Sequence, residues 1–98
     1  MTSSTVWIFT GARSQFPSAV FHAKHEATAW IRQHRLTGTL TEYPVGMGVF
    51  EWAIDRGFFS PTKPTHYEAP FIQTFSSAGQ NHLHFDDGIC SYFTAQTP

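Results

Sequence analysis

The chain has 98 residues, and its 16 aromatic side chains outnumber its 13 charged ones, whereas charged residues usually make up about a quarter of a domain. The net charge of −1 gives no reason to expect nucleic-acid binding, and the single cysteine excludes an intramolecular disulfide. No window reaches the roughly 18 apolar residues of a membrane span, and the first residues lack a signal-peptide pattern, so we expect a soluble cytoplasmic protein.

The first forty residues predict two strands and one helix. Residues 5–10 are β-branched and aromatic throughout, which favours a buried strand, and residues 19–22 fit a second strand after a loop that contains Gly and Pro. From residue 24 to residue 36, four residues have the spacing of one face of an amphipathic helix. They are Ala27, Trp30, Ile31 and His34. Gly38 follows at a position where helices commonly end.

The middle of the chain predicts a third strand and a second helix. Residues 39–43 favour a strand that Pro44 ends, and residues 49–56 have the period of an amphipathic helix. The apolar face of this helix contains Phe50, Ala53 and Ile54. Trp52 stands beside that face, so we expect its side chain to be exposed.

The last forty residues predict a long loop and a hairpin. Three prolines within residues 60–70 favour a loop with little regular structure, and residues 71–75 fit one helical turn or a short strand equally well. Asp87-Gly88 is a strong two-residue turn signal that joins residues 82–86 to residues 89–94.

This order of elements predicts one α+β domain over residues 1–98, with frayed ends at residues 1–4 and 95–98. We expect a mainly antiparallel sheet with two helices packed on one face. The element order is β-β-α-β-α, then a short element, then β-β.

One candidate metal site lies on the predicted strand of residues 82–86. Alternate residues of a strand share a face, so His82, His84 and Asp86 would align there. Two imidazoles and a carboxylate suit Zn²⁺. The simpler interpretation is a solvated strand face, with Leu83 and Phe85 pointing into the core.

Signals for catalysis are weak. A lone cysteine is usually a small buried hydrophobic residue, and this is the first interpretation of Cys90. Hydrolysis by Cys90, with His84 as a base, is a remaining hypothesis. No assembled set of catalytic residues is apparent, so the chain is more typical of a protein that is not an enzyme and that needs no cofactor.

Binding of a protein partner is the leading hypothesis. Residues 41–98 contain two basic and six acidic residues, a net charge of −4, and interface hot spots favour Trp, Tyr and Arg. The candidate partner-binding residues are Tyr43, Trp52, Tyr67 and Tyr92, together with Glu51 and Asp55 on the second predicted helix. The alternative is a metal- or small-ligand-binding domain that uses the His82, His84 and Asp86 face.

Several short motifs are distributed along residues 6–88. They are Val6-Trp7-Ile8-Phe9, Phe16-Pro17-Ser18, Ala29-Trp30-Ile31, Gly38-Thr39-Leu40-Thr41, Trp52-Ala53-Ile54, Phe75-Ser76-Ser77 and His82-x-His84. As a set they resemble a family of small bacterial domains of unknown function. Gly46 departs from the family pattern, in which an acid often follows Tyr-Pro-Val, and the first helix lacks the usual initial serine.

The resemblance implies no established activity and no active-site residues. Members of the family look like free-standing cytosolic proteins of bacteria and their mobile elements. That setting is similar to the setting of immunity proteins and phage-encoded inhibitors, which suggests a protein that blocks a partner sterically.

Overall fold

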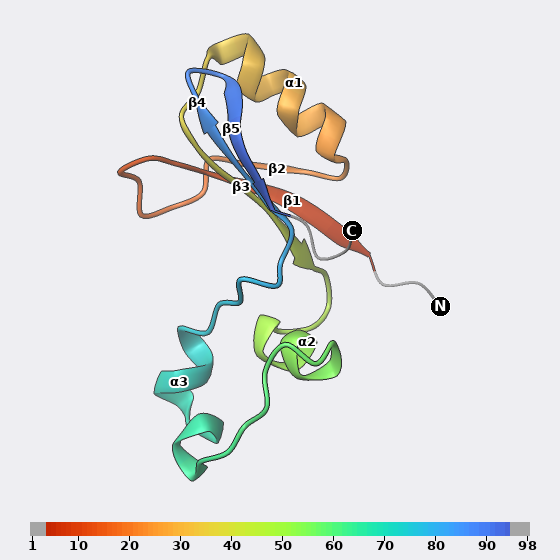
Figure 1. Cartoon of the computed structure of the whole chain (residues 1–98), viewed down its shortest axis with the longest axis vertical. Coiled ribbons are helices and arrows are strands. Elements are labelled where there is room, and N and C mark those ends of the chain that lie inside the picture. The colour runs from red at the N-terminus through yellow and green to blue at the C-terminus, as the bar shows by residue number, and fades with distance from the viewer. Residues whose placement is uncertain (1–3, 95–98) are drawn as a thin grey trace.

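A computed structural model describes the backbone of residues 4–94 and the side chains of residues 4–91 (Figure 1). Five strands form one antiparallel sheet in the order β2-β1-β3-β4-β5. The strands are β1 (Thr5–Gly11), β2 (Ala19–Phe21), β3 (Gly38–Pro44), β4 (His82–Asp86) and β5 (Ile89–Thr94). The helices are α1 (Lys24–His34), α2 (Val49–Asp55), the short 3₁₀ helix η1 (Pro64–Tyr67) and α3 (Ala69–Gln73). The predicted α+β class is confirmed.

The main core lies between α1 and one face of the sheet. Side chains alternate along a strand, and this alternation buries Trp7 and Phe9 of β1, while α1 contributes Ala27 and Ile31 at helical spacing. The remaining buried members of this cluster are Leu40, Leu83 and Phe85. Trp30 packs at the margin, with its ring centroid 5.8 Å from that of Phe9. The predicted strand and helix faces of this part of the chain are therefore confirmed, except that His34, expected on the buried face of α1, is exposed.

The first helix ends earlier than expected, and Gly38 is not its cap. Arg35 takes the left-handed conformation that closes α1, with φ of 55°, and the amide of Leu36 donates to the carbonyl of Ile31. Gly38 instead begins β3, where a Cβ atom would lie 2.4 Å from the carbonyl oxygen of Thr10. Its missing side chain permits the close approach of β3 to β1.

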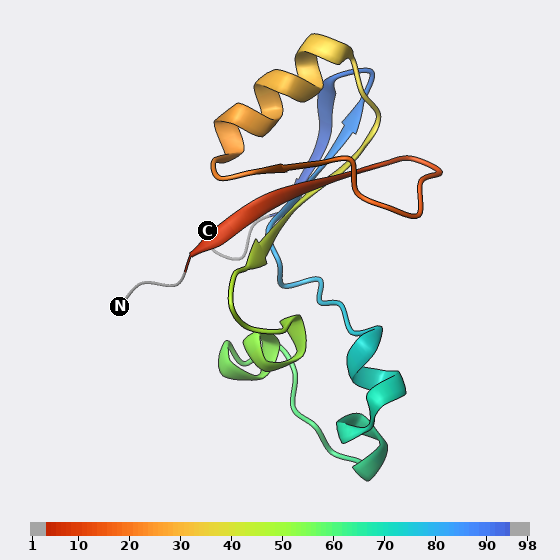
Figure 2. The same cartoon turned by 180° about the vertical axis from the view of Figure 1, so that it is seen from behind.

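The second helix does not pack on the face of the sheet. Figures 1 and 2 show α2, η1 and α3 beyond one end of the sheet, away from α1. We call residues 45–77 the lobe. Two helices were expected on one face of the sheet, but only α1 packs there. The apolar side of α2 instead contacts other residues of the lobe, such as Phe75.

The interior of the lobe is a cluster of aromatic rings. Phe50 of α2 is buried, and its ring centroid lies 5.5 Å from that of Phe75 and 6.2 Å from that of Phe71. Phe59 stacks on Phe71 at 5.6 Å. Residues 71–75, which fitted a helical turn or a strand equally well, belong in part to a helix, since α3 extends to Gln73. Pro70 lies in the first turn of α3, where proline favours a helix start.

The turn between β4 and β5 and the start of the described chain are both tied to other segments by main-chain hydrogen bonds. The Asp87-Gly88 turn between β4 and β5 is confirmed, with φ of 53° and 82°. It packs on the segment after α1, where the amide of Gly88 donates to the carbonyl of Leu36. Ser4, expected to fray, accepts a hydrogen bond from the amide of Val45. Residues 1–3 and 95–98 lie outside the described part.

Candidate functional site

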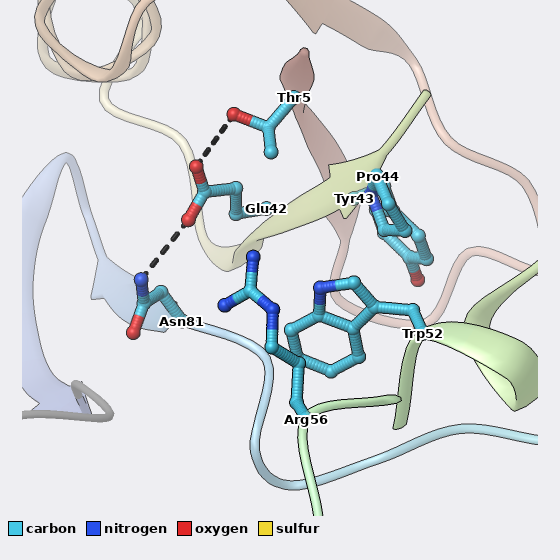
Figure 3. A pocket seen from close by; sticks show the side chains of 7 residues that line it. All are labelled: Thr5, Glu42, Tyr43, Pro44, Trp52, Arg56 and Asn81. Atoms are coloured by element: carbon cyan, nitrogen blue, oxygen red, sulfur yellow. Dashed lines mark hydrogen bonds between the residues drawn. The ribbon is translucent and has the colours of Figure 1, made fainter. Parts of the chain in front are cut away.

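A pocket of about 140 Å³ lies where the lobe meets the end of the sheet (Figure 3). The ends of the strands supply one wall, and α2 with the residue after it supplies the other. The lining residues are Thr5, Glu42, Tyr43, Pro44, Trp52, Arg56 and Asn81. The pocket is therefore built from segments that are far apart in the sequence.

The carboxylate of Glu42 is held in place by two side chains. The hydroxyl of Thr5 donates to one carboxylate oxygen over 2.6 Å, and the side-chain amide of Asn81 donates to the other over 3.0 Å (Figure 3). The main chain is fixed as well, since the amide of Glu42 donates to the carbonyl of Asn81 over 2.9 Å. Glu42 thus presents its negative charge in a defined position.

A buried amide fixes the strand segment that carries Glu42. Gln80 is only 3% exposed, and its side chain donates to the carbonyl of Glu42 over 3.1 Å. Its amide oxygen accepts a hydrogen bond from the amide of Ser77. The sequence pattern did not single out Glu42, Gln80 or Asn81. The pairing of β3 with β4 brings these residues together, and a local pattern does not show that pairing.

The other wall of the pocket combines an indole and a guanidinium. Trp52 is 7% exposed and stacks on Phe58, with ring centroids 5.6 Å apart. The guanidinium of Arg56 lies over the indole, 5.5 Å from its centroid. In this arrangement the π electrons of the indole attract the positive charge of the guanidinium. Within the described residues this guanidinium forms no ion pair. Figure 3 shows it turned toward the side of the pocket that holds Glu42 and Asn81.

The expectation that Trp52 is an exposed partner contact is wrong. The period of α2 is helical, as predicted, but α2 packs against the end of the sheet and the rest of the lobe rather than on the sheet face. As a result Trp52 is buried and Ile54 is exposed. Trp52 contributes to the pocket and to the stack with Phe58.

The other candidate partner-binding residues fall in three places. Tyr67 lies on the lobe and is 64% exposed, while Glu51 and Asp55 are exposed on α2. Tyr43 is half-buried and lines the pocket with Trp52. Tyr92 belongs to β5, opposite His84, and its side chain lies outside the described residues.

The candidate metal ligands do not converge. His82 and His84 lie on the side of β4 opposite Leu83, as predicted, with ring centroids 5.2 Å apart. The Nδ1 atom of His82 donates to the carbonyl of Gln80. Asp86 is exposed and accepts a weak hydrogen bond from Thr37 instead. In the part of the chain that the structure describes, no three His, Cys, Asp or Glu side chains form a group that could hold a metal ion.

Cys90 lies on the edge strand β5, and the interpretation of it as a buried hydrophobic residue is wrong. Its thiol is exposed, and its partner across the strands is Phe85. The register shift between His84 and Phe85 determines this pairing. A register shift of this kind cannot be read from a local pattern.

Exposed apolar side chains concentrate on the lobe. Of the eight large apolar residues that the described structure leaves exposed, five belong to residues 45–67. They are Val45, Met47, Ile54, Phe58 and Tyr67. The lobe thus holds a pocket at its base and most of the large apolar side chains that are exposed among the described residues. Within residues 4–94, none of the helices has both the length and the apolar character needed to cross a lipid bilayer.

Most of the chain matches a known protein family. Residues 6–91 match the family described as Domain of unknown function (DUF7710), and the chain belongs to that family. Neither the curated proteins nor the solved structures include a significant match.

Proposed function

We propose that this family member is a non-enzymatic protein-binding module, and that the outer side of the lobe contacts the partner. The observation that carries the proposal is the concentration of exposed apolar side chains on residues 45–67. Exposed apolar surface that gathers in one region is typical of interaction sites. The main core packs α1 against the sheet and needs none of these side chains.

The exposed side of α2 suggests the chemistry of the partner. Ile54 is exposed between two acidic residues of the same helix, Glu51 and Asp55. An apolar centre with a negatively charged rim complements a partner surface that has an apolar centre and a basic rim. Tyr67 adds an exposed aromatic side chain of the kind that dominates binding energy at interfaces.

The proposed mode of action is steric. The lobe projects from the end of the sheet (Figures 1 and 2), so it can cover a partner's surface while the sheet remains outside the contact. This is the mode of an immunity-type or phage-encoded inhibitor. Action in the cytoplasm is part of the proposal, because a chain with a single cysteine forms no intramolecular disulfide and suits a reducing compartment.

A matched pair of variants tests the lobe surface. The lobe variant carries Ile54→Glu and Tyr67→Ala, and the control carries Phe16→Glu and Ile89→Glu, which are 73% and 70% exposed outside the lobe. The wild-type protein is used to capture a partner from a lysate of the source organism, and binding is then measured with purified components. We expect the lobe variant to weaken binding at least about tenfold and the control to leave it unchanged.

Circular dichroism and thermal unfolding would show that both variants fold. The proposal fails if the two variants bind equally well, or if the captured partner proves to be a substrate that the chain converts.

A further inference from the structure

Two opposite charges line the pocket without neutralising each other. A carboxylate and a guanidinium are both ionised at neutral pH, and Glu42 and Arg56 both line the cavity. Within the described residues Arg56 has no carboxylate oxygen within ion-pair distance. A positive and a negative group therefore remain available to a molecule in the pocket.

The carboxylate of Glu42 retains acceptor capacity. Each of its oxygens accepts one hydrogen bond, from Thr5 and from Asn81, whereas a carboxylate offers about four acceptor sites. The two donors fix the orientation of the group and leave lone pairs for a further donor. A site whose charged group is already oriented loses less entropy when a ligand binds.

The guanidinium of Arg56 is similarly prepared. It lies over the indole of Trp52, 5.5 Å from the ring centroid, and this indole is itself fixed by stacking on Phe58. The N–H groups at its edge can still donate in the paired geometry that suits a carboxylate. The indole limits the freedom of the side chain, so the cation is directed into the pocket.

We infer that this pocket binds a small zwitterion, an α-amino acid with a short side chain, whose ammonium group contacts Glu42 and whose carboxylate contacts Arg56. A ligand with a single charge would be attracted by one of the two groups and repelled by the other, whereas a zwitterion satisfies both. The volume of about 140 Å³ is below the roughly 300 Å³ at which drug-sized ligand sites begin. The inference uses the pocket alone and does not depend on the proposed protein partner.

Titration of the ¹⁵N-labelled chain tests the inference. Glycine and L-alanine at millimolar concentrations should produce saturable chemical-shift changes at the indole N–H of Trp52 and the side-chain amide of Asn81. N-acetylglycine lacks the ammonium group and glycinamide lacks the carboxylate, so both should bind at least about tenfold more weakly, because a hydrogen bond to a charged group contributes about 1.5–3 kcal/mol.

Two variants assign the contacts. Glu42→Gln and Arg56→Gln should each weaken glycine binding by at least about tenfold. Arg32→Gln, which removes an exposed arginine of α1 outside the pocket, should leave binding unchanged. Arg56 is exposed, so Arg56→Gln is expected to fold even if Glu42→Gln proves unstable.

Three results would overturn the inference. They are the absence of saturable shifts with both amino acids, binding of N-acetylglycine and glycinamide as strong as that of glycine, and unchanged glycine binding by both pocket variants. If no amino acid binds and a double-mutant cycle on the free energy of unfolding shows coupling between Glu42 and Arg56, the two charges stabilise the fold and do not bind a ligand.

Discussion

The side chain of Gln80 donates a hydrogen bond to the main-chain carbonyl of Glu42 over 3.1 Å. Within residues 4–91, Gln80 is the one polar residue that is buried, and its amide oxygen also accepts from Ser77. The chain that returns from the lobe is thereby joined to β3 at the residue that supplies the negative charge of the pocket. A buried polar group in this position stabilises the structure only while both of its partners are in place.

Replacing Gln80 by methionine tests this connection. Gln80→Met keeps the length of the side chain but leaves the carbonyl of Glu42 and the amide of Ser77 without this partner. We expect the free energy of unfolding to fall by about 1–3 kcal/mol, the usual effect of an unsatisfied buried group. Urea denaturation measures the change. Gln33→Met, at an exposed position of α1, should change stability by less than about 0.5 kcal/mol, and equal effects of the two substitutions would contradict the prediction.

The ion pair between Arg35 and Asp87 predicts a dependence of stability on pH. Two hydrogen bonds from the guanidinium, 2.8 and 3.2 Å long, hold the pKa of Asp87 below its usual value of 3.8, with a further contribution from charge attraction. A carboxyl whose pKa is lower in the folded state adds stability above its unfolded pKa and loses that contribution as the pH falls. The stabilisation is therefore present near neutral pH and disappears as the pH falls below about 4.

Asp87→Asn isolates this contribution. Asparagine tolerates the left-handed conformation at φ of 53°, so the turn is kept while the charge is removed. We expect wild type to unfold at a higher temperature than the variant at pH 7, and the difference to shrink as the pH approaches 2.5. Both side chains are exposed, so about 1 M salt should shrink the difference as well. A difference that neither acid nor salt reduces would attribute the effect to the turn and not to the ion pair.

The two apolar clusters predict that the lobe opens separately from the sheet. The cluster between α1 and the sheet contains Leu40, whereas Phe50 packs among the rings of the lobe. Leu40→Ala should lower the free energy of unfolding by about 2–5 kcal/mol and speed amide exchange in every strand of the sheet. Phe50→Ala should speed exchange first in residues 49–75, while β1 and β3 stay protected.

Native-state hydrogen exchange followed by NMR distinguishes the two regions. Equal loss of protection in the sheet and the lobe upon Phe50→Ala would contradict the prediction, because it would show that the two clusters unfold together. The Leu40→Ala variant serves as the matched control for a buried truncation in the other cluster.

Local periodicity predicted the parts of the fold that pack on the sheet. Trp7 and Phe9 alternate into the core, and Ala27 and Ile31 recur at helical spacing, so each strand or helix face could be read from its own segment. The same pattern did not place α2. A helical period shows which residues share a face, but the neighbouring structure determines which face is buried. The neighbours of α2 are the rest of the lobe and the end of the sheet.

The pocket could not be predicted for a related reason. Glu42 and Asn81 are separated by 39 positions and meet because β3 pairs with β4. A local pattern contains no information about such a pairing, and single polar residues at the ends of strands are common. The structure explains much of the aromatic excess by two apolar clusters, one between α1 and the sheet and one within the lobe. Phe16 and Tyr67, in contrast, are exposed.

The hydrogen bond from the amide of Glu42 to the carbonyl of Asn81 brings together the two points at which the chain leaves and re-enters the sheet. The entropy of closing a chain segment between adjacent points rises slowly with length, by about 0.6 kcal/mol for each doubling. Segments of very different length could therefore span these two points with little effect on the strands. The sheet and α1 form a platform on which the intervening segment can be shortened, extended or exchanged, and a hybrid with a different insert is expected to keep the platform folded.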